Sequence, residues 1–345
     1  MRASIALGMT TKFTPLRPLF LLLALSLFSF APEAATALCK GTDLRKSLSA
    51  QDRARFAQQA AKVPFHEGII WEARKVDQII RIVGTHHAGD RRHRKVVADA
   101  SRFLRNADLL MLEMRTQEIG PQWDAVYQNP KVLTRSRGPY MSQLLRKDLW
   151  DQLSFRMQLY GFTPDQLNRI QPWFISGEVV RGDCDPFGWD RSKGVDARLE
   201  RIARSARVPM VSLETLEESL RTISRQPIRD QVRSIELDMQ SEAEIANMST
   251  TLRSAYHDGK LVEGMLVNEA FMYRDLNVSR SEVARLQRSH DKYILDERNK
   301  NWMPRILARK EKRIVVAVGA AHLPGQYGVL NLLRAKGYTL TQVAR

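Results

Sequence analysis

Residues Arg313–His322 read RIVVAVGAAH, and this stretch decides the fold. The run of apolar residues before its glycine is typical of a strand buried on both faces of a parallel sheet. The glycine then permits a sharp turn, and His322 follows it three residues later. The stretch Gln78–His87, QIIRIVGTHH, repeats this order and ends in His87. The sequence therefore predicts two strands that each deliver a histidine to the same edge of a sheet.

Shorter apolar runs supply the remaining strands. Leu109–Met114 is expected to form a strand that carries Glu113, with a basic helix before it from about Arg91 to Asn106. After the strand at Gln78–Val83, this gives the βαβ order of parallel α/β sheets. Further elements are expected as strands at Gly68–Ala73, Val208–Leu213 and Tyr338–Val343, and as a helix from about Gln326 to Lys336 that stops at Gly337. We therefore expect an α/β fold with a mainly parallel or mixed central sheet.

Two long stretches between the strands have helical periodicity. They span about 115–207 and about 216–310, and we interpret them as helical insertions over the carboxyl ends of the strands. Within the second stretch, Ser279 and Glu282 form a capping-box pattern that predicts the start of a helix. Residues 38–345 are therefore expected to form a single α/β domain with insertions.

Residues 1–37 have the pattern of a secretory signal peptide. Arg2, Lys12 and Arg17 precede an apolar run from Leu19 to Phe30, and small residues follow as far as Ala37. A membrane span needs about twenty apolar residues, so this run is short for a permanent anchor. We expect cleavage near Ala37 and a periplasmic or secreted protein, with an uncleaved anchor as the alternative.

The cysteine content and the charge fit an exported protein. Cys39 and Cys184 would reach an oxidising compartment, where they either pair or stay reduced, and they lack the spacing of a structural zinc site. The chain has 54 Lys and Arg against 38 Asp and Glu, a formal net charge of +16, which favours anionic partners such as an envelope surface. The basic residues are scattered, so we interpret them mainly as a solvated surface and expect no nucleic-acid partner.

Residues with functional chemistry gather at the predicted carboxyl edge of the sheet, where α/β proteins bind ligands. His87 and His322 each follow a strand, and Glu113 lies near the end of another. A buried carboxylate is costly unless it is paired or bound to a metal. Two imidazoles and one carboxylate are a common catalytic metal set. The alternatives are acid–base chemistry without a metal, and histidines that only hydrogen-bond the strand ends.

Arg298 is expected to support these three residues. Arg298, Trp302 and Arg305 share one face of the helix before the last Gly-x-x-His loop. Arg298 can neutralise a carboxylate or stabilise an oxyanion. The alternative role of both Arg298 and Glu113 is a structural ion pair, and Trp302 is expected in the core.

The other histidines are harder to assign. Either His86 or His87 can face the site, and the sequence leaves this choice open. His93, His257 and His290 have contexts typical of a surface and receive no role. The sequence contains no G-x-S-x-G elbow, H-E-x-x-H pair or Walker loop, which excludes the commonest serine-hydrolase, zincin and P-loop patterns.

Longer motifs around these residues resemble the TraB/GumN family, over roughly Gly68 to Leu340. An aliphatic residue is more usual in that family where this chain has His86. The motifs are Gly84-Thr85-x-His87 with Gly89-Asp90, Glu113 in its apolar strand, Pro172-Trp173, Gly194-Val195-Asp196, Leu213-Glu214-Thr215, Glu297-Arg298-Asn299-x-Asn301-Trp302, and Val318-Gly319-Ala320-x-His322-Leu323-Pro324-Gly325-x-x-Gly328.

The resemblance implies a fold related to the TIKI proteins, the haem-binding ChaN lipoproteins and the erythromycin esterases. TIKI proteins are metal-dependent proteases that cut short N-terminal segments from secreted signalling proteins, with manganese or cobalt favoured. By this resemblance His87, His322 and Glu113 would form the metal-binding or catalytic core, with Arg298 beside it. Glu214 matches a family position for which we expect a structural role.

We therefore predict an exported metal-dependent peptidase or hydrolase that acts on a peptide or a secreted protein. A divalent ion (manganese, cobalt or zinc) would activate water, and Glu113 would ligate the ion or accept the proton of the water. One alternative is a binding protein for haem, metal or peptide without turnover. Another is a protein associated with the envelope or with surface polysaccharide.

Overall fold

The computed structural model describes residues 41–158, 161–178, 193–240 and 242–343. Within this part, six strands form one sheet in the order β4-β3-β5-β2-β1-β6. The predicted signal peptide, Cys39 and Cys184 lie outside the described residues. The strands are β1 (Ile70–Lys75), β2 (Gln78–Thr85), β3 (Leu109–Leu112), β4 (Met210–Ser212), β5 (Arg313–Gly319) and β6 (Thr339–Gln342).

The sheet is mixed, with a parallel part that contains the three long apolar strands. β4, β3, β5 and β2 run parallel, whereas β1 pairs antiparallel with both β2 and β6. β5 lies between β2 and β3, so that Ala317 pairs with Val83 on one side and with Leu112 on the other. The residues that follow these three positions therefore meet at one edge. The predicted α/β class with a mixed sheet is confirmed.

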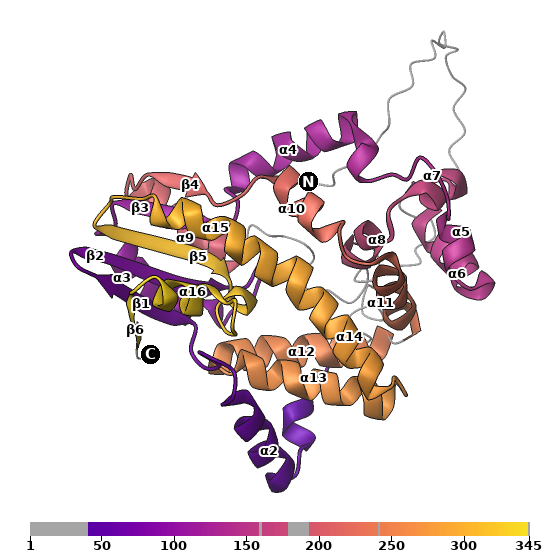
Figure 1. The fold of residues 1–345 in the computed structure, drawn as a ribbon, viewed down its shortest axis with the longest axis horizontal. Coiled ribbons are helices and arrows are strands. Elements are labelled where there is room, and N and C mark those ends of the chain that lie inside the picture. Colours follow the sequence, from indigo (N-terminus) through magenta and orange to yellow (C-terminus); the bar gives the residue numbers. More distant parts are fainter. Residues whose placement is uncertain (1–40, 159–160, 179–192, 241, 344–345) are drawn as a thin grey trace, which may run out of the picture.

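Helices cover both faces of the sheet (Figure 1). α3 (His93–Leu104) and α9 (Val195–Ser205) share one apolar cluster with the sheet, and α15 (Glu297–Leu307) and α16 (Val329–Ala335) share the other. Because neighbouring strand residues point to opposite faces, Val315 of β5 joins the first cluster and Val316 joins the second. Each fully buried side chain of this size contributes about 1.5–3 kcal/mol.

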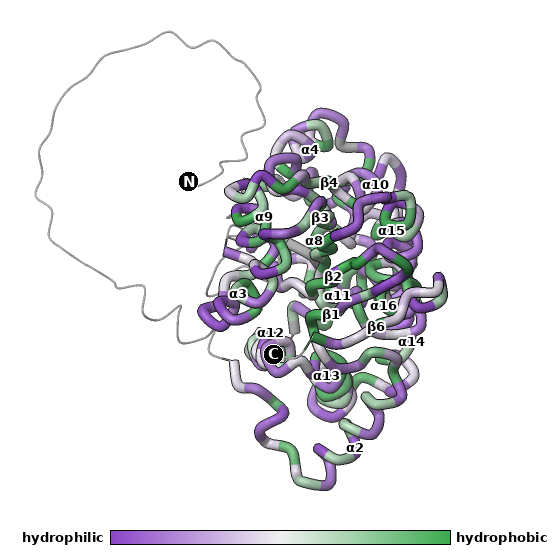
Figure 2. The backbone as a smooth tube through the Cα atoms, turned by 90° about the vertical axis from the view of Figure 1, so that its left-hand side faces the viewer, coloured by the Kyte–Doolittle hydropathy of each residue, from purple (hydrophilic) through white to green (hydrophobic). Residues whose placement is uncertain are grey.

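The other helices surround the carboxyl edge and the lower end of the molecule in Figure 1. Figure 2 shows the strands as a largely apolar centre, with hydrophilic segments outside. These helices are α2 (Ala50–Ala60), α4 (Thr116–Gln128), α5 (Met141–Leu144), α6 (Lys147–Gln158), α7 (Pro164–Arg169), α8 (Pro172–Glu178), α10 (Leu216–Ile223), α11 (Ile228–Gln240), α12 (Glu242–Asp258), α13 (Leu261–Asp275) and α14 (Arg280–His290), with short 3-10 helices η1 (Leu44–Ser47), η2 (Pro130–Val132) and η5 (Ala320–His322) and a π-helix η4 (Asp291–Asp296).

Local signals set several of these boundaries as the sequence predicts. The Ser279 hydroxyl accepts the backbone N–H of Glu282 at 3.2 Å and starts α14. Gly337 follows α16 with a φ of +86°, a conformation that suits glycine at a helix end. β3 is shorter than expected: it ends at Leu112, so Glu113 is the first residue beyond the strand.

The two helical stretches contain more than insertions. Their last helices, α9 and α15, pack on the faces of the sheet rather than over its end, because Leu199 on α9 and Trp302 and Ile306 on α15 are fully buried in the two sheet cores. The predicted core position of Trp302 is confirmed. Among the described residues, no helix has the length and apolar character that crossing a membrane requires.

Candidate active site

Three loops meet at the carboxyl edge of the parallel strands. β2 leads to His87, β3 to Glu113, and β5 to His322 on the short helix η5. The first and third loops approach closely, since a Cβ on Gly84 would lie 3.1 Å from the Cα and Cβ atoms of Ala320. The two Gly-x-x-His stretches are thus neighbours in space, as their positions after parallel strands predict.

Arg298 joins the carboxylates of this edge. Its Nη2 donates to Glu113 Oε2 at 2.7 Å and to Glu214 Oε1 at 2.5 Å, and its Nε donates to Glu214 Oε1 at 2.9 Å. Trp302 Nε1 donates to the other Glu214 oxygen at 3.0 Å. The second oxygen of Glu113 accepts the backbone N–H of Gly319 at 2.6 Å. The ion pair between Glu113 and Arg298 is therefore present, and Glu214 contacts both Arg298 and Trp302.

His322 is held in one orientation and one tautomer. Asn299 Nδ2 donates to the carbonyl of Tyr327 at 2.9 Å, so its Oδ1 is the atom that accepts from His322 Nδ1 at 2.7 Å. His322 Nε2 then carries the lone pair, and Arg298 Nη1 lies 3.2 Å from it as a donor. His322 is 4% exposed. Its ring is therefore prepared as an acceptor or as a metal ligand.

His87 faces the site, which resolves the choice between the two adjacent histidines. Its Nδ1 lies 3.0 Å from Oδ1 of Asp196, on the first turn of α9. This approach needs Gly194, because a Cβ there would lie 2.3 Å from the His87 carbonyl oxygen. His86 points elsewhere: its ring centroid lies 5.5 Å from that of Tyr256.

Burial and charge oppose each other in this cluster. Burial by itself raises the pKa of Glu113, but the positive charge of Arg298 holds it well below its usual range. Burial raises the pKa of Glu214 despite the same guanidinium. Burial also lowers the pKa of His322 to about 3. For Arg298, burial works toward a lower pKa, but the two glutamates raise it above the usual value. At neutral pH the cluster thus contains a neutral His322 beside the charged pair Glu113–Arg298.

A small space at Gly319 lies among the three predicted metal ligands. A Cβ built on Gly319 would lie 3.2 Å from Glu113 Oε1, 3.5 Å from His322 Cδ2 and 3.6 Å from His87 Nε2. Two imidazole nitrogens and a carboxylate are ligand types that divalent metals commonly bind. As the side chains stand, no three His, Cys, Asp or Glu in the described ranges are close enough together to hold a metal. The residue types are those of a metal site, but Glu113 and His322 contact Arg298, and binding of a metal would require these side chains to move.

The cluster opens into a pocket of about 580 Å³, within the size range of ligand sites. His87, Glu113, Asp196, Glu214 and Arg298 line one part of it. The remainder is largely apolar, with a few polar side chains. The apolar lining includes Trp123, Trp173, Phe174, Leu216, Leu220, Met272 and Leu286, and the polar lining includes Gln226, Ser234 and Gln287.

The structure adds residues that sequence reasoning gave no role. Asp196 and Asn299 fix the two site histidines, and both lie in motifs noted in the sequence, which was the available signal. The surface prediction for His93 was wrong: it is 0% exposed, and its Nε2 lies 2.8 Å from the Ala88 carbonyl oxygen. His257 is also largely covered, with its side chain 8% exposed, whereas the half-exposed His290 lines the site pocket.

Comparison with known proteins identifies the family of this chain. The model of the TraB/PrgY/gumN family matches residues 69–342, and the chain belongs to that family. The match spans all six strands and every residue of the cluster.

Similar proteins occur in two enteric bacteria. The chain is 20% identical over 256 residues to the uncharacterized protein YbaP of Escherichia coli (strain K12), which covers 73% of this chain and 87% of that protein. The uncharacterized protein YbaP of Shigella flexneri matches to the same extent. These relatives support the family without adding an activity.

Proposed function

We propose that this protein is a metal-dependent hydrolase that cleaves peptide bonds in a peptide or a secreted protein. The observation that carries the proposal is that His87, Glu113 and His322 meet around Gly319. They lie at the edge of a large pocket whose remaining lining is largely apolar. Membership of the TraB/PrgY/gumN family, which the resemblance relates to metal-dependent proteases, supports it.

The two histidines are set up as ligands by their partners. Asp196 and Asn299 each accept from an Nδ1 atom, so that Nε2 is the atom that would bind a metal when the ring is neutral. Manganese, cobalt and zinc all accept imidazole and carboxylate. When bound, such an ion would polarise the scissile carbonyl and lower the pKa of water to about 7.

Glu113 and Arg298 have the charge that such a reaction needs. Glu113 is ionised and can bind the metal or accept the proton of the attacking water. Arg298 keeps its charge at any physiological pH and offers N–H donors to the negative charge that develops on the carbonyl oxygen. Its bonds to Glu214 hold the guanidinium in place at the edge of the pocket.

The pocket suits a peptide. Its aromatic and aliphatic walls can cover apolar side chains, and its amide and hydroxyl groups can hydrogen-bond a peptide backbone. The leader pattern of residues 1–37 supports substrates in the periplasm or outside the cell, and the net charge of +16 supports association with an anionic envelope surface.

A peptide-library digest analysed by mass spectrometry tests the proposal. Wild-type protein with manganese or cobalt should cleave a subset of peptides, and chelation should stop cleavage. Glu113→Gln should lower the rate about 100-fold or more. Glu217→Gln is the matched control, because Glu217 is an exposed glutamate whose partner is Arg221. Cleavage that persists unchanged in Glu113→Gln would overturn the proposal.

A second candidate is a peptide-binding protein without turnover. This function is favoured because both carboxylate oxygens of Glu113 already accept hydrogen bonds, one from Gly319 and one from Arg298. In that case library peptides should remain bound and intact on the wild-type protein, with or without metal. Intact peptides retained by both the wild type and Glu113→Gln would select this function over hydrolysis.

A further inference from the structure

The helices α3 and α9 lie side by side on one face of the sheet, and Figure 2 shows α9 directly above α3 on the left of the molecule. Val96 and Leu104 of α3 and Leu199 of α9 pack into the same apolar cluster. Because both helices bury their inner sides against one face of the sheet, their outer sides meet solvent in the same direction. These outer sides therefore form one continuous surface.

The surface is strongly basic. Its positively charged side chains are exposed, and most follow one another at three- or four-residue spacings, as residues on one side of a helix do. They are Arg91, Arg92, Arg94, Lys95, Arg102 and Arg105 in or next to α3, and Arg201, Arg204 and Arg207 in or next to α9. Folding thus gathers basic residues that are scattered along the sequence onto one surface, which we call the basic face.

The carboxylates of the same two segments are largely covered. Residues 90–105 and 195–207 contain Asp90, Asp99, Asp196 and Glu200, whose side chains are at most 23% exposed. Glu200, for example, lies inward and accepts the backbone N–H of Thr116 at 2.8 Å. The negative charge of these segments is therefore turned toward the protein, whereas their positive charge is turned toward solvent.

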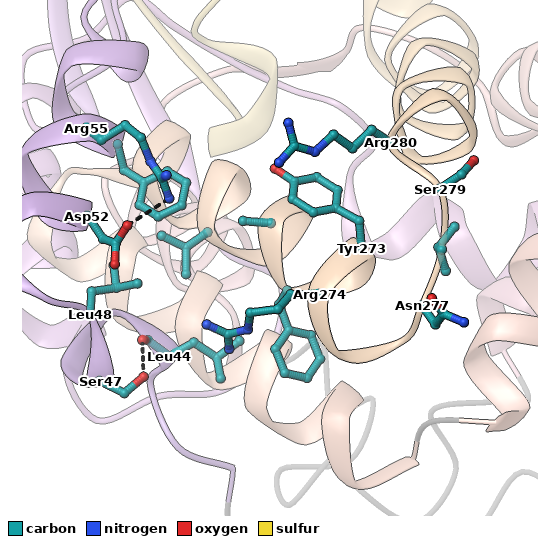
Figure 3. Close-up of a pocket in the computed structure, with 15 residues that line it drawn as sticks. Leu44, Ser47, Leu48, Asp52, Arg55, Tyr273, Arg274, Asn277, Ser279 and Arg280 are labelled. Atoms are coloured by element: carbon teal, nitrogen blue, oxygen red, sulfur yellow. Dashed lines mark hydrogen bonds and ion pairs between the residues drawn. The ribbon is translucent and has the colours of Figure 1, made fainter.

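Arginines on other parts of the surface lie beside exposed carboxylates. Figure 3 shows one example on α2, where Arg55 and Asp52 are 2.9 Å apart and 57% and 39% exposed. Arg221 and Glu217 on α10 are another such pair, 70% and 59% exposed. The two charges of an exposed pair largely cancel toward a distant partner. The charges of the basic face add instead, so this surface attracts an anionic partner.

The basic face is broad and has few aromatic residues. α3 has 12 residues and α9 has 11, so each helix is about 17 Å long, and neighbouring helix axes lie about 8–10 Å apart. Charges that spread in two directions suit an extended anionic surface better than a single polyanion chain. Phe103 is the one Phe, Tyr or Trp of the two helices, and Arg81 lies over its ring. The face thus lacks the row of exposed rings on which single-stranded nucleic acids stack.

We propose that the basic face binds the surface of an anionic phospholipid bilayer. Its arginine and lysine side chains contact the lipid phosphates, and the helices stay outside the hydrocarbon, because none of the exposed large hydrophobic side chains of the described residues lies on α3 or α9. The proposal rests on the association with an anionic envelope surface that the proposed function includes, and it is independent of peptide cleavage.

Co-sedimentation of the purified full chain with phosphatidylglycerol vesicles tests the proposal. The protein should pellet with these vesicles at low salt, and sodium chloride at about 0.5 M should release it, because salt screens charges over a few ångströms. Phosphatidylcholine vesicles measure any binding through the apolar run Leu19–Phe30, which needs no anionic lipid, and this part is subtracted. Glu113→Gln should bind like the wild type, so that vesicle binding and peptide cleavage are tested separately.

Variants of the basic face locate the binding. The triple variant Arg94→Gln, Lys95→Gln and Arg201→Gln removes exposed cations from both helices and should weaken binding to phosphatidylglycerol at least twentyfold, because each such residue near an anionic surface contributes about fivefold. Arg201→Glu reverses one charge, should weaken binding at least fivefold, and serves as a second variant if the triple variant does not fold.

The matched control is the triple variant Lys131→Gln, Arg137→Gln and Arg288→Gln. It removes the same net charge from exposed positions outside α3 and α9 and should change the affinity less than threefold. Equal loss of binding in the two triple variants would overturn the proposal, as would equal pelleting with phosphatidylcholine. Retention on a heparin column at a salt concentration that releases the protein from the vesicles would assign the face to a linear polyanion instead.

Discussion

Arg298 Nη2 lies 2.7 Å from Glu113 Oε2, although the two residues are 185 positions apart in the chain. The contact joins the first residue after β3 to α15 at the carboxyl edge of the sheet. Glu214 shares the same guanidinium, so one arginine offsets the buried carboxylate of Glu214 and the partly buried carboxylate of Glu113. This relationship makes the cluster important for stability as well as for the proposed chemistry.

Loss of Arg298 should therefore destabilise the fold strongly. Arg298→Met leaves Glu113 and Glu214 without their partner, and breaking a buried pair in this way costs about 3–5 kcal/mol. Arg225→Met is the control, because its pair with Glu297 lies at the surface and should contribute about 1 kcal/mol or less. Urea denaturation measures both; similar losses in the two variants would contradict the central position of Arg298.

Filling the space at Gly319 should remove function and leave the fold intact. Gly319 has φ −49° and ψ 134°, which alanine adopts without strain, and the backbone N–H to Glu113 is kept. The added methyl group occupies the space between Glu113 and the two histidines, so Gly319→Ala should lower peptide cleavage and metal affinity at least tenfold.

The control for that variant is Gly120→Ala in α4. A Cβ on Gly120 meets nothing within 4 Å, and alanine in a helix is favoured over glycine by about 1 kcal/mol. Gly120→Ala should be fully active and slightly more stable. Full activity of Gly319→Ala would show that the space is not used.

The residues that orient the histidines should matter for metal affinity. Asn299→Ala removes the acceptor of His322 Nδ1, and changes of this kind typically cost 10–100-fold in metal affinity. Asn301→Ala, at an exposed position on the same helix, is the control and should have no effect. Metal titration with a chelator as competitor measures the two; equal affinities would place Asn299 outside the site's function.

Asp90 should make stability depend on pH in the acid range. Burial by itself raises the Asp90 pKa, but hydrogen bonds and charge from Arg92 hold it well below its usual value in the folded protein. A lowered folded-state pKa stabilises the fold above the unfolded pKa of about 3.9, and this contribution is lost as the pH falls toward the folded value.

The free energy of unfolding of Asp90→Asn should therefore lie below that of the wild type at pH 7, and the difference should shrink below about pH 4. Urea denaturation of both proteins at pH 7 and at pH 3 measures this change. A difference that is the same at both pH values would contradict the shifted pKa.

The sequence predicted which residues form strands and helices better than it predicted which of these elements lie side by side. The run of apolar residues before Gly319 identified β5, because burial on both faces of a sheet leaves a local pattern. The position of β5 between β2 and β3 leaves no local pattern, since strand order depends on contacts between distant residues. That position is nevertheless what brings His322 between His87 and Glu113.

The same limit explains the residues that were missed. Asp196 and Asn299 act through contacts 109 and 23 residues away, and neither periodicity nor charge pattern shows such partners. His93 lies in a strongly basic stretch that resembles a surface, but the inward face of α3 buries it. The choice between His86 and His87 likewise depended on α9, whose first turn provides a carboxylate to only one of them.

The metal content of the purified protein tests the central claim most directly. Four proteins are incubated with manganese or cobalt, desalted and analysed by elemental mass spectrometry: the wild type, His87→Ala, His322→Ala and His290→Ala. The last is the control, because His290 is a histidine that lines the pocket outside the predicted metal set. Our account predicts about one divalent ion per chain in the wild type and in His290→Ala, and loss of the ion in the other two variants. No metal in the wild type, or equal metal in all four proteins, would contradict it.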